Sequence, residues 1–386
     1  MFRKRLIASV VLASVLSFGV PALADGYRTT VGSGDDEIPL VVVKGTPYEM
    51  GHAFGALMKE EARSLLTTFL SRAREGEPEV YSDENLDAAW RTMAPHINPR
   101  FVDELKGLAD SAGVSEDLVR RVHMIPAISA YACSGAALWG EATREDVLYQ
   151  FRNLDYIMEG GLQEYPAVVI YLPDEGIAHV NPTFAGYIGS NTGMNAEGIT
   201  LTEMGYSPER EYPYDLDGIH FAILFRDILY EAESLDDAVN MIERAKRIKK
   251  YRYIVGDGKN RRAVKMRAFA PRLDIWQDND PKDEVAPNVK DGLVYNCENR
   301  DPVGWAHIQR YYGGYDAALV IQLAKSVGGG TGNLLGVVYD ATNLELWAAY
   351  AQGQECAYRR TSVHIDMNDY LDFARRPPGA VVIEGN

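Results

Sequence analysis

Apolar and polar positions divide this chain into a helical first part and a strand-rich remainder. After the segment Thr46-Pro47-Tyr48-Glu49, apolar residues recur three or four positions apart. That segment has the form of a capping box with Pro at the first helical position. Two further helices are predicted, over Asn98 to Ala112 with Gly113 as the stop and over Ser115 to Met124.

From Ala132 onward, short runs rich in β-branched and aromatic residues alternate with turn signals, which predicts strands. The predicted strands are CSGAALWGEA, DVLYQFRNLDY, AVVIYLP, GITLTEMGY, YRYIVGD, RAVKMRAF, GLVYNC, LLGVVYD and ELWAAYA. Helical patterns interrupt them over Phe221 to Lys250 and over Trp305 to Ser326. Strand runs separated by helices favour the α+β class, with two antiparallel sheets sandwiched between helical layers.

The first residues have the pattern of a secretory signal peptide. Arg3-Lys4-Arg5 precedes an apolar run from Leu6 to Val20, which is followed by Ala22-Leu23-Ala24. The apolar run is shorter than the ~18 residues that a membrane-spanning helix needs. We therefore expect an exported protein, periplasmic or extracellular, that begins at Asp25 once residues 1–24 are removed.

Composition limits the classes of partner that we expect and the number of disulfides that can form. The formal net charge is -16, and residues 1–24 contribute only positive charge, so nucleic acid and anionic membranes are not expected partners. The three cysteines, Cys133, Cys297 and Cys356, allow at most one disulfide. Because export favours disulfides, we expect Cys297 and Cys356 to pair, which leaves Cys133 as a thiol. The sequence contains no motif that calls for a metal or cofactor.

Cys133 is the first candidate for chemistry. It opens one predicted strand, and Arg152 and Asp155 lie in the next, so a hairpin would bring a thiol, a guanidinium and a carboxylate together. An Arg favours the thiolate, and an Asp can orient an amine or a protonated base. The alternatives are a small buried cysteine and a structural ion pair at a strand end.

Six segments carry a resemblance to a known family. They are KGTPYEMGHAFGALM, ACSGAALWGEAT, FRNLDY, TGMNAEGI, YNCEN and LLGVVYDATNLELW. In order and approximate spacing the chain resembles the isopenicillin-N acyltransferase-like cysteine peptidases. That group belongs to the N-terminal-nucleophile hydrolases and is similar to choloylglycine hydrolases and acid-ceramidase-type amidases. The resemblance implies a four-layer αββα sandwich, no cofactor, and amidase or acyltransferase activity on linear amide C–N bonds of N-acyl amides or small peptides.

The resemblance also implies activation by self-cleavage between Ala132 and Cys133. The new α-amine of Cys133 would then serve as the base for its own thiol. An α-amine has a pKa of about 7.7 to 8.0 and a Cys thiol about 8.5, so proton exchange between them is nearly balanced. The cut would separate a mostly helical segment, residues 25–132, from a hydrolase core, residues 133–386.

By position, Arg152 and Asp155 match the family's Arg and Asp, with Asp155 holding the α-amine and Arg152 beside the thiolate or the polar end of the substrate. Asn296 matches the family's Asn that donates to the oxyanion. Cys133, Arg152, Asp155 and Asn296 are therefore the predicted catalytic residues.

Three further residues are predicted to contact substrate. Asn299 lies close enough to Asn296 to be confused with it, and Arg310 corresponds loosely to a second Arg in some relatives. Where choloylglycine hydrolases carry an Asn, this chain reads Thr202-Glu203-Met204-Gly205. The second oxyanion donor is therefore unassigned, and Glu203 becomes a candidate pocket residue.

Two other functions compete with the amidase. One is a noncatalytic exported binding protein that keeps the fold, and the other is a lipid-ester hydrolase of the phospholipase-B-like kind. The intact set of Cys, Arg, Asp and Asn favours the enzyme. In each case the expected partner is a small molecule or peptide.

Overall fold

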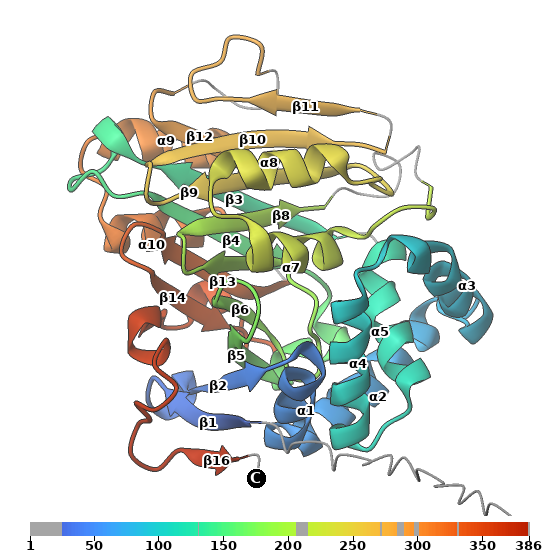
Figure 1. Ribbon diagram of the computed structural model, residues 1–386. Helices are drawn as coiled ribbons and strands as arrows, with labels where there is room; N and C mark the ends of the chain where they lie inside the picture. The colour runs from blue at the N-terminus through green and yellow to red at the C-terminus, as the bar shows by residue number, and fades with distance from the viewer. Residues whose placement is uncertain are drawn as a thin grey trace, which may run out of the picture.

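Two β-sheets packed face to face form the centre of the molecule (Figure 1). The computed structural model describes residues 25–129, 131–205, 215–270, 272–283, 289–296, 301–329 and 332–384. The predicted signal peptide, Asn299 and Cys297 lie outside these ranges.

The larger sheet has ten strands among the described residues. In spatial order they are β11 (Leu273–Trp276), β10 (Arg262–Ala268), β9 (Tyr251–Asp257), β8 (Ile199–Met204), β7 (Thr192–Asn195), β6 (His179–Phe184), β5 (Pro166–Pro173), β2 (Ile38–Gly45), β1 (Asp25–Val31) and β16 (Val381–Ile383). Neighbours are antiparallel except β2 and β5, so the prediction of wholly antiparallel sheets is wrong for this pair. The connection between β2 and β5 spans residues 46–165, which is long enough for the chain to return in the same direction.

The smaller sheet carries the predicted catalytic hairpin. Its strands in order are β12 (Gly292–Asn296), β3 (Ala132–Leu138), β4 (Tyr149–Asp155), β13 (Asn333–Asp340), β14 (Glu345–Tyr350) and β15 (Val363–Asp366). All neighbours in it are antiparallel. The hairpin is confirmed, because β3 pairs with β4 and Cys133 lies opposite Leu154.

Helices cover both sheets, which confirms the α+β sandwich. At one end (lower right in Figure 1) lie α1 (Pro47–Leu57), α2 (Lys59–Gly76), α3 (Asp83–Met93), α4 (Pro99–Ala112) and α5 (Glu116–Ile128). The large sheet is covered by α7 (Phe221–Glu231) and α8 (Leu235–Arg244), and the small sheet by α9 (Asp301–Tyr311) and α10 (Ala317–Ser326). No described helix is both long enough and apolar enough to cross a membrane.

The predicted caps are confirmed. Thr46 and Glu49 form the capping box of α1, Asn98 caps α4, and Gly113 ends α4 with φ of 69°. That left-handed conformation favours glycine.

Two predicted helices are each two helices in the structure. The pattern from Phe221 to Lys250 breaks at Ala232, where Ser234 caps the new helix α8 through its side chain. The pattern from Trp305 to Ser326 breaks at Gly313, whose φ is 81°. In both places apolar residues continue at helical spacing along the sequence, but a local capping or turn residue ends the first helix. The helix α3 and the strands β1, β2, β6, β7, β11, β15 and β16 were not predicted from the sequence.

Two apolar cores follow from the alternation of side chains along the small sheet. Cys133, Ala137 and Leu154 face the larger sheet and belong to the main core. Ala136 and Phe151 point the other way, against α9 and α10. A strand residue therefore reaches one core or the other according to its parity.

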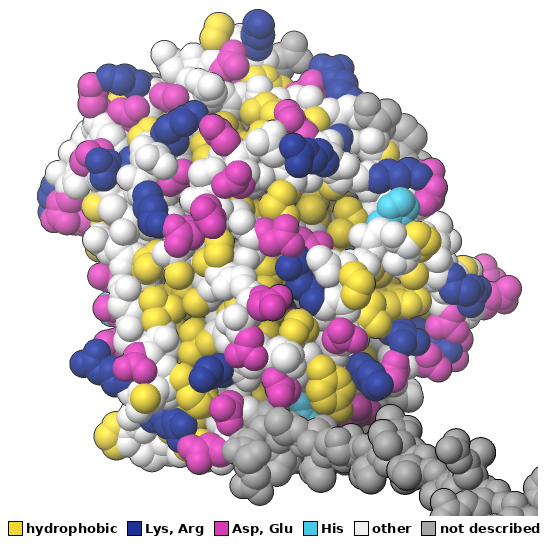
Figure 2. Space-filling model, in the orientation of Figure 1, with side chains coloured by type: hydrophobic (Ala, Val, Ile, Leu, Met, Phe, Trp, Pro, Cys, Tyr) yellow, Lys and Arg dark blue, Asp and Glu magenta, His cyan; other side chains and the backbone are white. Residues whose placement is uncertain are grey.

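Acidic and basic side chains are interspersed on the face of the molecule shown in Figure 2. Neither sign of charge forms one large patch on this face.

Candidate functional site

The thiol of Cys133 lies between the two sheets and is fully buried. Arg152, on the neighbouring strand β4, donates a hydrogen bond from Nη2 to Cys133 Sγ at 3.2 Å. Arg152 pairs with Gly135, two residues along β3, so its side chain shares the face of Cys133. A buried guanidinium at this distance stabilises the thiolate, which is the nucleophilic form.

Glu203 reaches the same point from β8 of the larger sheet. Arg152 Nε donates to the carbonyl oxygen of Glu203 at 2.9 Å, and Nη2 lies 3.4 Å from Glu203 Oε2. The hydroxyl of Tyr131 donates to Glu203 Oε1 at 2.9 Å. Burial by itself would lower the pKa of Arg152, but Cys133 and Glu203 raise it above its ordinary value. The guanidinium therefore stays charged beside the thiol.

Asp155 lies on the opposite face of the small sheet from the thiol. Its backbone pairs with Ala132, the residue before the predicted cut. Its Oδ1 accepts hydrogen bonds from the backbone N–H of Gly329 at 3.0 Å and from Asn333 Nδ2 at 2.9 Å. The backbone of Asp155 therefore lies beside Ala132, while its carboxylate is held by Gly329 and Asn333 and does not share the face of the sulfur.

Gly329 and Asn333 were missed by sequence reasoning as site residues. Gly329 belongs to a glycine-rich stretch with no chemical group of its own to mark a site, yet it packs directly on the carboxyl group of Asp155. Asn333 begins the buried strand β13, and a polar residue at the start of an apolar strand was the available signal.

The structure brings the remaining predicted residues to different places. The backbone of Asn296 pairs with Ser134, next to Cys133, while its side chain is outside the described part. Arg310 is exposed on α9, with its guanidinium 5.3 Å from the ring centre of Tyr311. Within the described residues Arg310 has no contact with Cys133 or Glu203.

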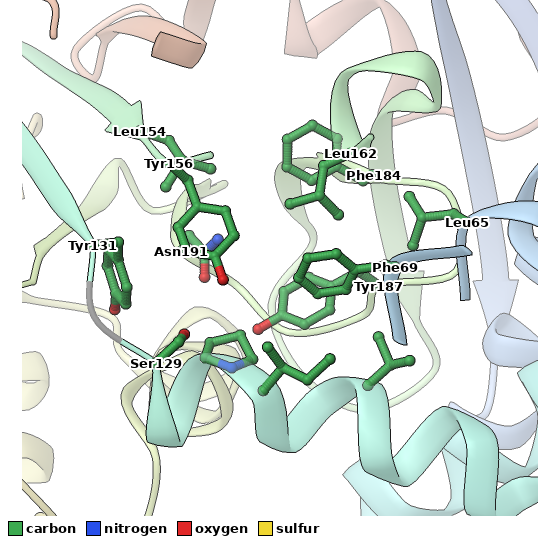
Figure 3. A pocket seen from close by; sticks show the side chains of 13 residues that line it. Leu65, Phe69, Ser129, Tyr131, Leu154, Tyr156, Leu162, Phe184, Tyr187 and Asn191 are labelled. Atoms are coloured by element: carbon green, nitrogen blue, oxygen red, sulfur yellow. The ribbon is translucent and has the colours of Figure 1, made fainter. Parts of the chain in front are cut away.

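An apolar pocket, part of which opens to solvent, lies beside this cluster. Figure 3 shows polar side chains at one end of it and apolar ones at the other. The polar end has Ser129, Tyr131, Tyr156, Tyr187 and Asn191; the apolar end has Leu65, Phe69, Leu162 and Phe184, and Val122, Ile125, Pro126 and Leu154 complete the lining.

The polar end of the pocket is contiguous with the cysteine site. Tyr131 lines the pocket and also binds Glu203, and the backbone N–H of Glu203 donates to the carbonyl of Asn191 at 3.4 Å. Burial raises the pKa of Tyr187, with Glu203 raising it further and Arg152 lowering it, so both charges are close to this phenol.

Three buried polar atoms around this junction have no hydrogen-bond partner in the described part of the chain: Arg152 Nη1, Tyr187 OH and Asn191 Oδ1. Buried polar groups are normally satisfied, so unpaired ones in a pocket indicate a site for a polar ligand group. Tyr187 and Asn191 were missed from sequence, although Asn191 directly precedes the TGMNAEGI segment.

No group of three or more His, Cys, Asp or Glu side chains that could hold a metal ion occurs within the described ranges.

Comparison with known proteins gives three kinds of match. Residues 142–279 match the family model of acyl-coenzyme A:6-aminopenicillanic acid acyl-transferase. Protein dcd1B of Dictyostelium discoideum is 27% identical over 298 residues, 72% of this chain and 59% of that protein. The N-acylethanolamine-hydrolyzing acid amidase of Mus musculus is 27% identical over 230 residues, 54% of this chain and 61% of the amidase. The chain therefore spans about three fifths of these relatives.

Solved structures with similar folds include a Caenorhabditis elegans N-acylethanolamine-hydrolyzing acid amidase ortholog. Its TM-score is 0.43 at 15% identity, covering 60% of this chain and 98% of the other. A conjugated bile acid hydrolase variant from Clostridium perfringens has a TM-score of 0.42 at 12% identity, covering 65% and 97%. The match of residues 142–279 to the acyl-transferase family model confirms the family resemblance stated from the sequence.

Proposed function

We propose that this chain, as a relative of the acyl-transferase family matched by residues 142–279, is a cysteine amidase or acyltransferase that forms a thioester on Cys133. The observation that carries the proposal is the hydrogen bond from Arg152 to the buried thiol, beside an apolar pocket with a polar end. The names of the curated relatives, which include an N-acylethanolamine-hydrolyzing acid amidase, support an amide substrate.

The reaction divides into two acyl transfers. The Cys133 thiolate attacks the amide carbonyl, the C–N bond breaks, and the amine leaves with a proton, which yields a thioester. Water or a second amine then attacks the thioester, and the thiolate leaves. Arg152 stabilises the thiolate in both steps, and Asn296 is proposed to donate to the oxyanion of each tetrahedral intermediate.

The lining of the pocket supports an apolar acyl group. Leu65, Phe69, Leu162 and Phe184 would contact the hydrocarbon, and burying each methylene contributes about 0.8 kcal/mol. The amide would then lie at the polar end, near Tyr187 and Asn191. We propose substrates with an apolar acyl chain on a small amine or peptide.

Self-cleavage and export belong to the same proposal. An uncut Cys133 has no α-amine, so cleavage after Ala132 would supply the base, and Asp155 beside that bond would hold the new amine. The N-terminal pattern of residues 1–24 supports export to the periplasm or the medium.

The proposal is tested by trapping the acyl-enzyme. The purified protein is mixed with N-acyl amides of increasing chain length, small peptides, β-lactams or lysolipids, quenched in acid, and its intact mass is measured. We expect an added mass equal to the acyl group on wild type and none on Cys133→Ala. Absence of any adduct and any turnover across the panel would overturn the amidase in favour of a binding protein. Turnover of lysolipids alone would favour the lipid-ester hydrolase.

A further inference from the structure

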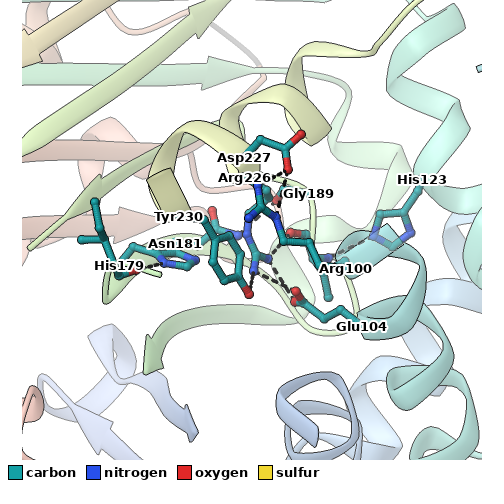
Figure 4. Close-up of polar contacts among 11 residues, drawn as sticks. Arg100, Glu104, His123, His179, Asn181, Gly189, Arg226, Asp227 and Tyr230 are labelled. Carbon is teal, nitrogen blue, oxygen red and sulfur yellow. Dashed lines mark hydrogen bonds and ion pairs between the residues drawn. The ribbon is translucent and has the colours of Figure 1, made fainter. Parts of the chain in front are cut away.

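A second buried polar cluster joins α4, α7 and the segment between β6 and β7 (Figure 4). At its centre is Arg226 of α7, which is 2% exposed and forms a two-pronged ion pair with Glu104 of α4, at 3.0 and 2.8 Å. The guanidinium also lies 4.0 Å from the ring centre of Tyr171. A charge this deep is costly unless it is paired, so its retention needs a reason beyond packing.

The reason is found in the segment between β6 and β7. Arg226 Nη1 donates to the carbonyl oxygen of Ile188 at 2.6 Å. The N–H of the same residue donates to His123 Nε2 at 3.0 Å, and His123 Nδ1 is bonded to the carbonyl of Val119. Both backbone groups of Ile188 are therefore bound by buried side chains.

The neighbours of Ile188 are held in the same way. Asn181 Nδ2 donates to the carbonyl of Gly189 at 3.1 Å, and Thr183 Oγ1 donates to the carbonyl of Tyr187 at 2.8 Å. The ring of Tyr187 stacks on His123 with centres 4.7 Å apart. Residues 187–191, which we call the pocket loop, thus have their backbone fixed on the side away from the pocket, while Tyr187 and Asn191 line it.

We infer that Arg226, held by Glu104, is a positioning residue: it fixes the pocket loop so that Tyr187 and Asn191 form the wall of the substrate pocket. This inference rests on the proposed amidase function for its catalytic readout.

The N-terminal segment takes part in this arrangement through two side chains. Glu104 and His123 both precede the proposed cut at Ala132, whereas Arg226 and the pocket loop follow it. The segment 25–132 is then a required part of the substrate site in the cleaved protein, and it acts through the loop as well as through its own lining residues.

A matched control exists between the same two helices. Arg100 of α4 binds Asp227 of α7 through Nε at 3.1 Å and Nη2 at 2.7 Å, and this pair makes no contact with the pocket loop. Asp227→Asn therefore removes an ion pair between α4 and α7 without removing a loop contact. Glu104→Gln removes the charge that holds Arg226, and Arg226→Lys keeps a charge while losing the fork that reaches both Glu104 and Ile188.

The experiment compares these three variants with wild type. Hydrogen exchange of peptides covering residues 187–191 is measured on the folded protein, and KM and kcat are measured with long-chain and N-acetyl amides. For Glu104→Gln and Arg226→Lys we expect faster exchange in the pocket loop. We also expect KM to rise roughly tenfold or more for the long-chain amide with little change for the N-acetyl amide. Asp227→Asn should match wild type in both readouts.

The outcomes separate the two proposals. Unchanged loop exchange in both Glu104→Gln and Arg226→Lys would overturn the positioning role, whatever the activity. Equal losses of activity on the long-chain and the N-acetyl amide would also overturn the positioning role, because a lower folded fraction reduces activity on both substrates alike. If wild type hydrolyses no amide, the proposed function fails, and loop exchange together with binding of dodecanoate by calorimetry still tests the inference. If either Glu104→Gln or Arg226→Lys does not fold, the other of these two variants provides the test.

Discussion

At the scale of single residues, the candidate site is organised around the guanidinium of Arg152, which Cys133 and Glu203 share. Arg152 binds the Cys133 sulfur on one side and Glu203 on the other, so the charge that stabilises a thiolate is also the charge that neutralises a buried carboxylate. Arg152 Nη1 has no partner in the described part of the chain, so one donor remains for a ligand. Under the proposed function, this side chain would have two roles, stabilisation of the thiolate through Nη2 and contact with substrate through Nη1.

The oxyanion donor is tested by Asn296→Ala. The backbone of Asn296 pairs with Ser134, one residue from the nucleophile, and loss of one oxyanion donor typically lowers turnover by about 10²- to 10³-fold. We expect this loss in kcat with the fold and any processing intact. Asn299→Ala is the matched control and should have a much smaller effect. The reverse order in steady-state kinetics would mean that Asn299 is the donor.

At the scale of elements, segments that connect helices and strands carry residues of the candidate site. The turn at Gly329 binds Asp155, and the pocket loop between β6 and β7 lines the proposed substrate pocket. Loops on a rigid scaffold often carry function for this reason.

The turn is tested by Gly329→Ala. An added Cβ would overlap the carboxyl group of Asp155, so that group must move from the Ala132–Cys133 bond. We expect self-cleavage and turnover to fall by roughly tenfold to a hundredfold, as for other displaced catalytic groups. Gly76→Ala, whose Cβ would meet nothing within 4 Å, is the control. Normal processing in Gly329→Ala, measured by gel and mass spectrometry, would contradict a role for this turn.

His123, on helix α5, makes the free energy of unfolding depend on pH. Burial lowers the pKa of His123 to about 4, with Arg226 lowering it as well and the Val119 carbonyl raising it. The unfolded chain binds this proton below about pH 6.5 and the folded chain only near pH 4, so the free energy of unfolding falls as pH drops between these values. The slope from this residue is at most about 1.4 kcal/mol per pH unit.

Urea unfolding between pH 7 and pH 4 measures that slope. His123→Gln keeps an acceptor for the Ile188 N–H and removes the titration, so its slope should be shallower than that of wild type. His179 and His220, whose pKa values are also lowered by burial, should maintain the rest of the slope. His364→Gln, at an exposed position, is the control. Equal slopes for wild type and His123→Gln would contradict the assignment.

At the scale of the whole molecule, the segments before and after Ala132 are interleaved. Strands β1 and β2 from the first segment lie in the larger sheet between β5 and β16 of the second, and helices α2 and α5 line the pocket. The two parts share one apolar core. Separating them would expose much of that core to water, which is strongly unfavourable.

This arrangement leads to the prediction on self-cleavage. We expect two fragments, residues 25–132 and residues 133–386, that separate on a denaturing gel and elute together on a sizing column. N-terminal sequencing should find Cys133 at the start of the larger one. Cys133→Ala should remain one inactive chain, whereas Cys133→Ser should cut more slowly than wild type because a hydroxyl is a weaker nucleophile than a thiol. An active protein with an intact Ala132–Cys133 bond would require another base.

The sequence by itself determined the fold class, the hairpin of Cys133 and Arg152, and the caps of α1 and α4. Each of these depends on residues close along the chain: a capping box acts over three residues, and the hairpin partners lie on consecutive strands. The resemblance added the approximate place of Asn296, whose backbone the structure puts beside β3.

Only the tertiary structure decided which face each side chain occupies and what meets it there. Asp155 is three residues from Arg152, yet strand parity puts it on the other side of the sheet, against Gly329 and Asn333. Glu203 joins Arg152 from another sheet, and Arg226 reaches Glu104 from a distant helix. These partners are far apart in sequence, and packing of the sheets and helices selects them, so no local pattern could predict them.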